Sequence, residues 1–219
     1  MTTTTRVFSV RDLLMPAVGS GLLMALYLLL RPYGDSPGEV SSPQVQAEAF
    51  ASTWWVVAHV CGALALVMFA RLALRLADVD RTSFTARVAR WSGLAGAVLV
   101  LPYYGAETFA LHVIGSHAAA GQLDLLTLVP DIRNQPAAIT MFGLGLVLLA
   151  VSGVAVALTW TRRTNTWLAW PLGIAIALVL PQFYLPPVGR MAFGVAYLAA
   201  AALFAWSVVS VQRVPQPVG

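Results

Sequence analysis

Long apolar stretches recur along the chain, and they constrain its fold more than any other feature. Six of them lie at residues 13–30, 53–74, 91–115, 137–160, 167–185 and 188–211. A helix needs about 20 apolar residues to cross the ~30 Å hydrocarbon core of a bilayer. We therefore predict an all-α fold, a polytopic transmembrane helical bundle of about six spans that forms one integral membrane domain over residues 1–219.

The composition agrees with lipid as the main solvent of this chain. Hydrophobic residues make up 59% of the sequence and charged residues only 10%, whereas soluble domains carry about 25% charged residues. The net charge of +4 does not indicate a nucleic-acid partner, because the arginines are scattered between apolar blocks and form no single patch. The expected partner is the lipid bilayer.

The arginines predict the orientation of the spans. If the N-terminus is cytoplasmic, the outer segments hold only Arg31, Arg133 and Arg190. The inner segments then hold the other ten, which are Arg6, Arg11, Arg71, Arg75, Arg81, Arg87, Arg90, Arg162, Arg163 and Arg213. Cytoplasmic loops are enriched in Arg and Lys, so we predict a multi-pass protein of the inner (plasma) membrane with N- and C-termini both cytoplasmic.

Some segments carry weaker or more specific predictions. The fifth apolar block is the weakest span, because Pro171 and Pro181 interrupt it. The outer loop 31–52 is rich in Pro, Gly and Ser, and we expect it to be irregular. The outer loop 116–135 mixes leucines with Asp124 and Asp131, which predicts a short amphipathic helix on the outer surface.

Two ionisable residues lie well inside predicted spans. His59 precedes Arg75 by 16 residues and Glu107 follows Arg90 by 17 residues. At ~1.5 Å per residue both lie about 24–26 Å from the inner boundary, on adjacent antiparallel helices. A charge at mid-membrane costs about 2.5–3.5 kcal/mol and needs a partner, so a Glu107–His59 hydrogen bond or ion pair is expected.

Other polar residues approach the same level. Tyr103 and Tyr104 lie one turn inward of Glu107, and His112 lies further out on the same span. Arg190 begins the sixth span and Arg133 precedes the fourth. We predict that Glu107, His59, Tyr103, Tyr104, His112, Arg190 and Arg133 form an outward-opening polar cluster that serves as a ligand or proton site. The alternative is structural, with Glu107 pairing with Arg190 or His59 to fix the helix register.

No cofactor, metal site or catalytic residue is predicted. His59 and His112 differ in depth by six residues, about 9 Å, which argues against their binding one haem iron. The sequence contains no HExxH zinc motif, nucleophile elbow, P-loop or dinucleotide fingerprint. Cys61 is the only cysteine, so no intrachain disulfide is possible.

Four stretches carry a resemblance to a known group of proteins. They are WWVVAHVCGALALVMFARLALRL, YYGAETFALHVIG, DIRNQPAAITMFGLGLVLLAVSG and PQFYLPPVGRMAFG. Over residues 53–200 the chain resembles small polytopic integral membrane proteins of high-GC Gram-positive bacteria. The resemblance implies a bacterial inner-membrane protein with His59, Glu107, His112, Arg133 and Arg190 at the recognisable positions, and it implies no reaction.

Three functions remain open at this point. The first is a non-enzymatic accessory protein, sensor or ligand-binding membrane protein, with a small-molecule ligand or a membrane-protein partner. The second is a small proton-coupled transporter or permease in which Glu107 titrates. The third is a membrane enzyme that uses Glu107 on a lipid-like substrate, although one carboxylate gives acid–base catalysis little support. The absence of a second catalytic group and of an internal repeat favours the first.

Overall fold

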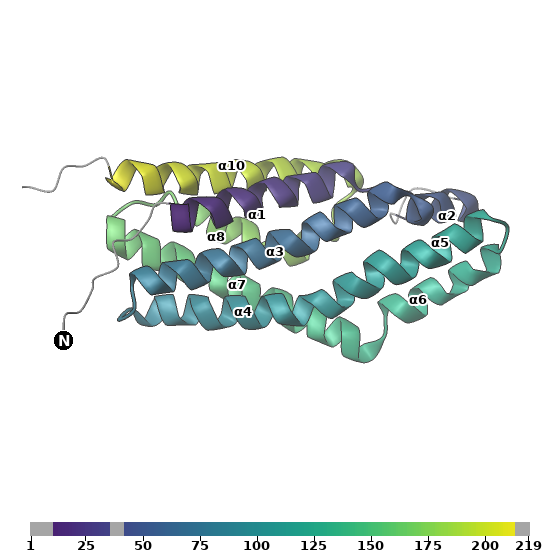
Figure 1. The fold of residues 1–219 in the computed structure, drawn as a ribbon, viewed down its shortest axis with the longest axis horizontal. Helices are drawn as coiled ribbons and strands as arrows, with labels where there is room; N and C mark the ends of the chain where they lie inside the picture. Colours follow the sequence, from purple (N-terminus) through teal and green to yellow (C-terminus); the bar gives the residue numbers. More distant parts are fainter. Residues whose placement is uncertain (1–10, 36–41, 213–219) are drawn as a thin grey trace, which may run out of the picture.

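The computed structural model describes residues 11–35 and 42–212, and every regular element in them is helical (Figure 1). This confirms the all-α prediction. The elements are α1 (Arg11–Leu30), α2 (Pro43–Ala51), α3 (Thr53–Val79), α4 (Phe84–Gly105), the π-helix η1 (Ala106–Ala110), α5 (Leu111–Ala119), the 3-10 helix η2 (Leu123–Thr127), α6 (Leu128–Arg133), α7 (Pro136–Thr164), α8 (Trp170–Ala177), α9 (Val179–Gln182) and α10 (Pro187–Gln212). Arg6 and Arg213, which entered the orientation argument, lie outside the described residues.

Five of the helices described are long and apolar enough to cross a membrane. They are α1, α3, the continuous helix Phe84–Ala119 that comprises α4, η1 and α5, α7, and α10. Figure 1 shows them lying lengthwise in one bundle, with neighbouring passes running in opposite directions. The first, second, third, fourth and sixth predicted apolar blocks therefore each correspond to a long helix.

The fifth predicted block is different, because it forms two short helices instead of one long one. Pro171 lies in the first turn of α8, where a missing N–H costs nothing. Pro181 lacks the N–H that would bond to the carbonyl of Ala177, the last residue of α8, and the helix breaks at Leu178. α8 packs against α7 and α10, and the segment returns the chain from the end of α7 to the start of α10 (Figure 1).

Both of the long loops, residues 31–52 and 116–135, contain helical segments. The loop expected to be irregular contains α2, whose N-cap Ser42 accepts a hydrogen bond from the Val45 amide at 3.3 Å. The second loop contains η2 and α6, after α5 has extended the third span to Ala119. Together α2, α5, η2 and α6 form a cap that projects beyond α1 and α10 (Figure 1). The cap encloses its own small core, made by Phe50, Trp55, Leu111 and Val129.

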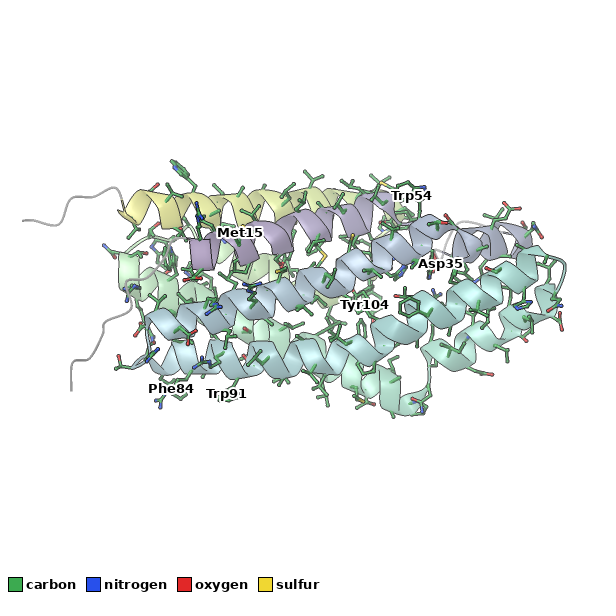
Figure 2. All side chains as sticks on the ribbon, in the orientation of Figure 1. Met15, Asp35, Trp54, Phe84, Trp91 and Tyr104 are labelled. Atoms are coloured by element: carbon green, nitrogen blue, oxygen red, sulfur yellow. The ribbon has the colours of Figure 1, made fainter. Side chains whose placement is uncertain are left out.

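Large apolar side chains cover the outside of the bundle. Met15, Phe84 and Trp91 stand away from it (Figure 2), with 70%, 71% and 67% of their surfaces exposed. Exposed side chains of this kind occur on every long helix. An outer surface this apolar is typical of a protein that faces hydrocarbon, because soluble monomers rarely expose large contiguous apolar patches.

Small residues allow two of the long helices to approach closely. A Cβ on Gly96 of α4 would lie 2.7 Å from the Gly145 carbonyl oxygen of α7, so only glycine fits at this crossing. α4 and α7 make the most extensive helix pair in the bundle. Their contact fixes one wall of the cavity described next.

Candidate functional site

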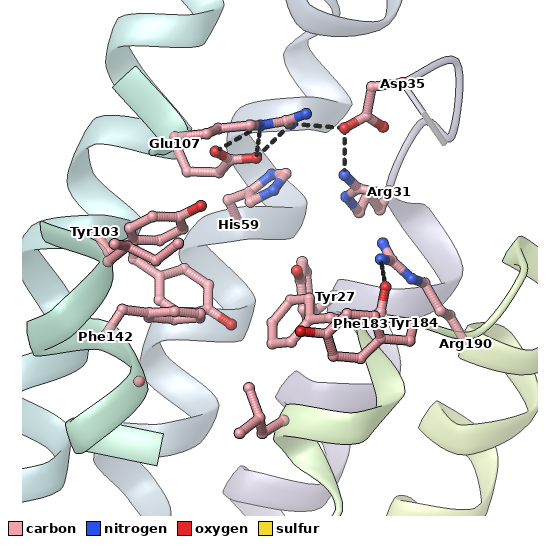
Figure 3. A pocket seen from close by; sticks show the side chains of 15 residues that line it. Tyr27, Arg31, Asp35, His59, Tyr103, Glu107, Phe142, Phe183, Tyr184 and Arg190 are labelled. Carbon is pink, nitrogen blue, oxygen red and sulfur yellow. Dashed lines mark hydrogen bonds and ion pairs between the residues drawn. The ribbon is translucent and has the colours of Figure 1, made fainter. Parts of the chain in front are cut away.

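A cavity of about 340 Å³ lies where the cap meets the bundle (Figure 3). Its walls come from α1 and the turn after it, α3, α4, η1, α6, α7, the α9 region and α10. Six of the residues predicted for the polar cluster line it: Glu107, His59, Tyr103, Tyr104, Arg133 and Arg190. Tertiary contacts thus bring together side chains that are far apart in the sequence.

A chain of ion pairs runs along one side of this cavity (Figure 3). Arg133 Nη2 lies 2.5 Å from Glu107 Oε1, and Arg133 Nε lies 3.1 and 3.2 Å from the two carboxylate oxygens. Arg133 Nη2 also lies 2.7 Å from Asp35 Oδ2, which accepts from Arg31 Nη2 at 2.8 Å. We name Glu107, Arg133, Asp35 and Arg31 the ion-pair chain. Glu107 is bound by a fork of guanidinium donors from Arg133. Asp35 accepts from two arginines through Oδ2 alone, and its Oδ1 has no donor among the described residues.

The ion-pair chain shifts the pKa values of Asp35 and Arg133, which both lie outside the membrane-spanning helices. Burial raises the pKa of Asp35, but Arg31 and Arg133 outweigh that effect, so its pKa is lowered. Burial lowers the pKa of Arg133, but Glu107 and Asp35 outweigh it and raise that pKa. Both groups are therefore held in their charged forms at neutral pH.

The expected bond between Glu107 and His59 is not formed. Both residues line the cavity, which agrees with the equal depth that was predicted for them. However, His59 Nδ1 lies 2.7 Å from the Trp55 carbonyl oxygen on its own helix, and Glu107 binds Arg133 instead. Because a carbonyl only accepts, Nδ1 carries the hydrogen. Depth along a helix could not fix the direction in which each side chain points.

The local backbone around Glu107 explains its direction. Residues Ala106–Ala110 form a π-helix, in which the Leu111 amide bonds to the Ala106 carbonyl five residues earlier. This extra residue rotates the following turn, and Figure 1 shows the axis turning between α4 and α5. Trp55 Nε1 donates to the Glu107 carbonyl at 2.9 Å, which ties the π-helix to α3. Such π-bulges occur frequently at functional sites.

Several donors at the cavity have no partner within the described residues. They are Nε and Nη1 of Arg31, Nε of Arg190 and the hydroxyl of Tyr104. Arg190 donates through Nη2 to the Phe183 carbonyl. No carboxylate in residues 11–35 and 42–212 makes an ion pair with it. Figure 3 shows Arg31 and Arg190 on the same side of the cavity. Buried donors without acceptors are costly. The Arg31 guanidinium also lies 5.1 Å from the centre of the Tyr33 ring and 5.0 Å from that of Trp55, and these cation–π contacts offset part of the cost.

Aromatic side chains line much of the cavity. Tyr103 stacks on Phe142, with ring centroids 4.3 Å apart. Phe142 meets Phe183 edge to face at 5.7 Å. Phe183 and Tyr184 lie beside Arg190 (Figure 3), whose guanidinium is 5.7 Å from the centre of the Phe183 ring. The cavity thus combines guanidinium groups with aromatic surface.

His112, the remaining predicted residue, lies outside the cavity. Its Nδ1 is 2.9 Å from the Phe50 carbonyl oxygen, inside the cap. In contrast, the prediction omitted Arg31 and Asp35, which form one end of the ion-pair chain. Their spacing of four residues directly after the first span was a usable signal, since i and i+4 side chains can pair on one face of a turn.

The described residues contain no group of three or more His, Cys, Asp or Glu side chains that could hold a metal ion. No protein-family model, curated protein or solved structure matches this chain.

Proposed function

We propose that this chain is a six-pass protein of a bacterial plasma membrane that binds an anionic small molecule in its outward-facing cavity and catalyses no reaction. In this topology α8 and α9 make the fifth crossing, and both termini are cytoplasmic. The distribution of ten inner and three outer arginines supports that orientation.

The unpartnered donors carry the binding proposal. The cavity holds three arginines, Arg31, Arg133 and Arg190, against two carboxylates, Asp35 and Glu107. With His59 neutral, its net charge is therefore positive. Guanidinium groups bind carboxylates and phosphates through two parallel hydrogen bonds, and Arg31 retains two free donors for that purpose. A ligand anion would neutralise the excess charge and satisfy these donors.

The ion-pair chain favours binding over proton transport or acid–base catalysis. Glu107 would have to exchange protons in either of those functions. Both of its carboxylate oxygens are bound by Arg133, which holds the side chain in place. Glu107 is better suited to positioning Arg133 at the cavity than to carrying a proton.

Binding can be tested with inorganic phosphate and with acetate on the detergent-purified protein. We expect isothermal titration calorimetry to detect saturable binding of at least one of these anions. Arg190→Gln should weaken it about ten- to hundredfold, because a hydrogen bond to a charged group contributes about 1.5–3 kcal/mol. Arg163→Gln removes the same charge from an exposed position on α7 and should leave binding unchanged. Equal loss in both variants, or no binding at all, would refute the proposal.

A further inference from the structure

We propose that the ligand is an anionic phospholipid of the outer leaflet, with its phosphate in the cavity and an acyl chain in a groove along α7. This inference rests on the proposed function, because it assigns the class of anion that the cavity binds. The groove is a second hollow of about 590 Å³ between α4, α7 and the α8–α9 segment.

The groove and the cavity are adjoining. Leu180 lines both of them. On α7, Phe142 and Gly143 line the cavity, and Leu146 and Val147 line the groove one turn further along. The two hollows therefore meet at Leu180, and a molecule that occupied both would run along α7 past this side chain.

The chemistry changes sharply from one hollow to the other. The cavity contains all three outer arginines, whereas the groove is lined by Ala, Val, Leu, Phe and Pro side chains and a single hydroxyl, that of Thr85. That hydroxyl is already bonded to Thr159 at 2.8 Å and Ser83 at 2.9 Å. A ligand that fits both hollows has an anionic head and an apolar tail.

The half of the groove nearest the cavity has the depth of one leaflet. From Leu146 to Leu158 the α7 wall of the groove covers 12 residues, or about 18 Å. Half of a ~30 Å hydrocarbon core is about 15 Å, which along α7 reaches from Phe142 to about residue 152. An acyl chain of the outer leaflet would therefore fill the groove from Leu146 to Val151, and Val154–Leu158 lie beyond the midplane. Phe142 precedes Arg162 by 20 residues, about 30 Å along the helix. If Arg162 marks the inner boundary, the aromatic edge of the cavity lies at the outer boundary, where headgroups are.

The bilayer itself supplies this occupant. A soluble anion would satisfy Arg31 and Arg190 but would leave the groove to unrelated lipid chains. A phospholipid satisfies the free guanidinium donors and fills the apolar groove with one molecule, which joins charge complementarity to hydrophobic burial.

The test examines the contributions of the lipid headgroup and of the acyl chain separately. Purified protein in a neutral detergent is mixed with phosphatidylglycerol, phosphatidylcholine or inorganic phosphate, and bound lipid is counted by native mass spectrometry while phosphate binding is measured by calorimetry. Val151→Trp fills the groove. Val195→Trp places the same side chain on an exposed position of α10 that does not line it, and thermal melting checks that both variants fold.

We expect retention of phosphatidylglycerol over phosphatidylcholine by about tenfold or more. Val151→Trp should lose phosphatidylglycerol by about tenfold while binding inorganic phosphate like the wild type, and Val195→Trp should change neither. If Val151→Trp retains phosphatidylglycerol, or if the two lipids bind equally, the lipid assignment is wrong. If inorganic phosphate still binds and Arg190→Gln still weakens that binding, the anion site is supported without the lipid assignment. If the wild type binds neither inorganic phosphate nor phosphatidylglycerol, both proposals are refuted.

Discussion

Arg133 and Asp35 are 98 positions apart in the sequence, yet Arg133 Nη2 lies 2.7 Å from Asp35 Oδ2. This ion pair joins the cap, which contributes Arg133, to the turn that follows α1. Only 3% of the Asp35 side chain is exposed. Removing one partner from a buried ion pair leaves an uncompensated charge and is strongly destabilising. The contact between cap and bundle therefore depends on Asp35.

Asp35→Asn should destabilise the protein by about 3–5 kcal/mol, because Arg31 and Arg133 both lose their shared anion. Thermal unfolding in detergent, followed by circular dichroism, measures this. Asp124→Asn, at an exposed position in η2, is the matched control and should leave the melting temperature unchanged. Equal melting temperatures for wild type and Asp35→Asn would contradict the role assigned to this carboxylate.

Asp35 should also make the stability of the protein fall at acidic pH. The pKa of Asp35 is lowered in the folded protein, so its contribution is present above its unfolded pKa of about 3.9. The contribution is lost as the pH falls below that value and through the folded pKa. Melting temperatures measured between pH 7 and pH 3 should decline in the wild type. The decline should be smaller in Asp35→Asn, which has no proton to take up at this position, and parallel pH curves would argue against the linkage.

Asp35 and Glu107 should be energetically coupled, because both bind Arg133. In a double-mutant cycle, Asp35→Asn and Glu107→Gln should deviate from additivity by about 0.5–3 kcal/mol. Chemical denaturation of the two single variants and the double variant gives the coupling. A cycle between Asp35→Asn and Asp124→Asn, which share no partner, should be additive within about 0.5 kcal/mol. Additivity in the first cycle would show that Arg133 does not connect the two carboxylates.

The packing of α8 on α7 depends on Gly153. A Cβ at this position would lie 1.9 Å from Ile176 Cγ2 and 2.7 Å from the Gly173 carbonyl oxygen. Gly153→Ala should therefore destabilise the protein by about 1–3 kcal/mol through overpacking. Gly143, on the same helix, has nothing within 4 Å of its ideal Cβ, so Gly143→Ala should be neutral or stabilising. Melting temperatures of the two variants distinguish these outcomes.

The six-pass topology can be tested by cysteine labelling in a Cys61→Ala background. A membrane-impermeant maleimide should label Ser116→Cys, in α5, from outside intact cells. Arg163→Cys in α7 and Ser210→Cys in α10 should react only after the cells are permeabilised, because α8 and α9 return the chain across the membrane between them. Labelling of Arg163→Cys and Ser210→Cys from opposite sides would exclude a crossing by α8 and α9.

The polar cluster was only partly predictable, and particular residues show why. Counting residues from the arginine-rich ends placed His59 and Glu107 at one depth, and both line the cavity. It could not predict that the π-helix Ala106–Ala110 would turn Glu107 toward Arg133. His112 was included by its sequence proximity but lies in the cap, bonded to Phe50. Arg31 and Asp35 were missed because they were assigned to a loop with no fixed structure.

The sequence by itself determined the helical class, the long apolar helices and the end of the bundle at which the ionisable residues gather. These follow from local composition, since a backbone in hydrocarbon must satisfy its own hydrogen bonds. The tertiary structure decided which side chains meet. The ion-pair chain, for example, joins Arg133 to Asp35. Pairings of this kind depend on helix rotation and on contacts across 98 positions, which no local pattern encodes.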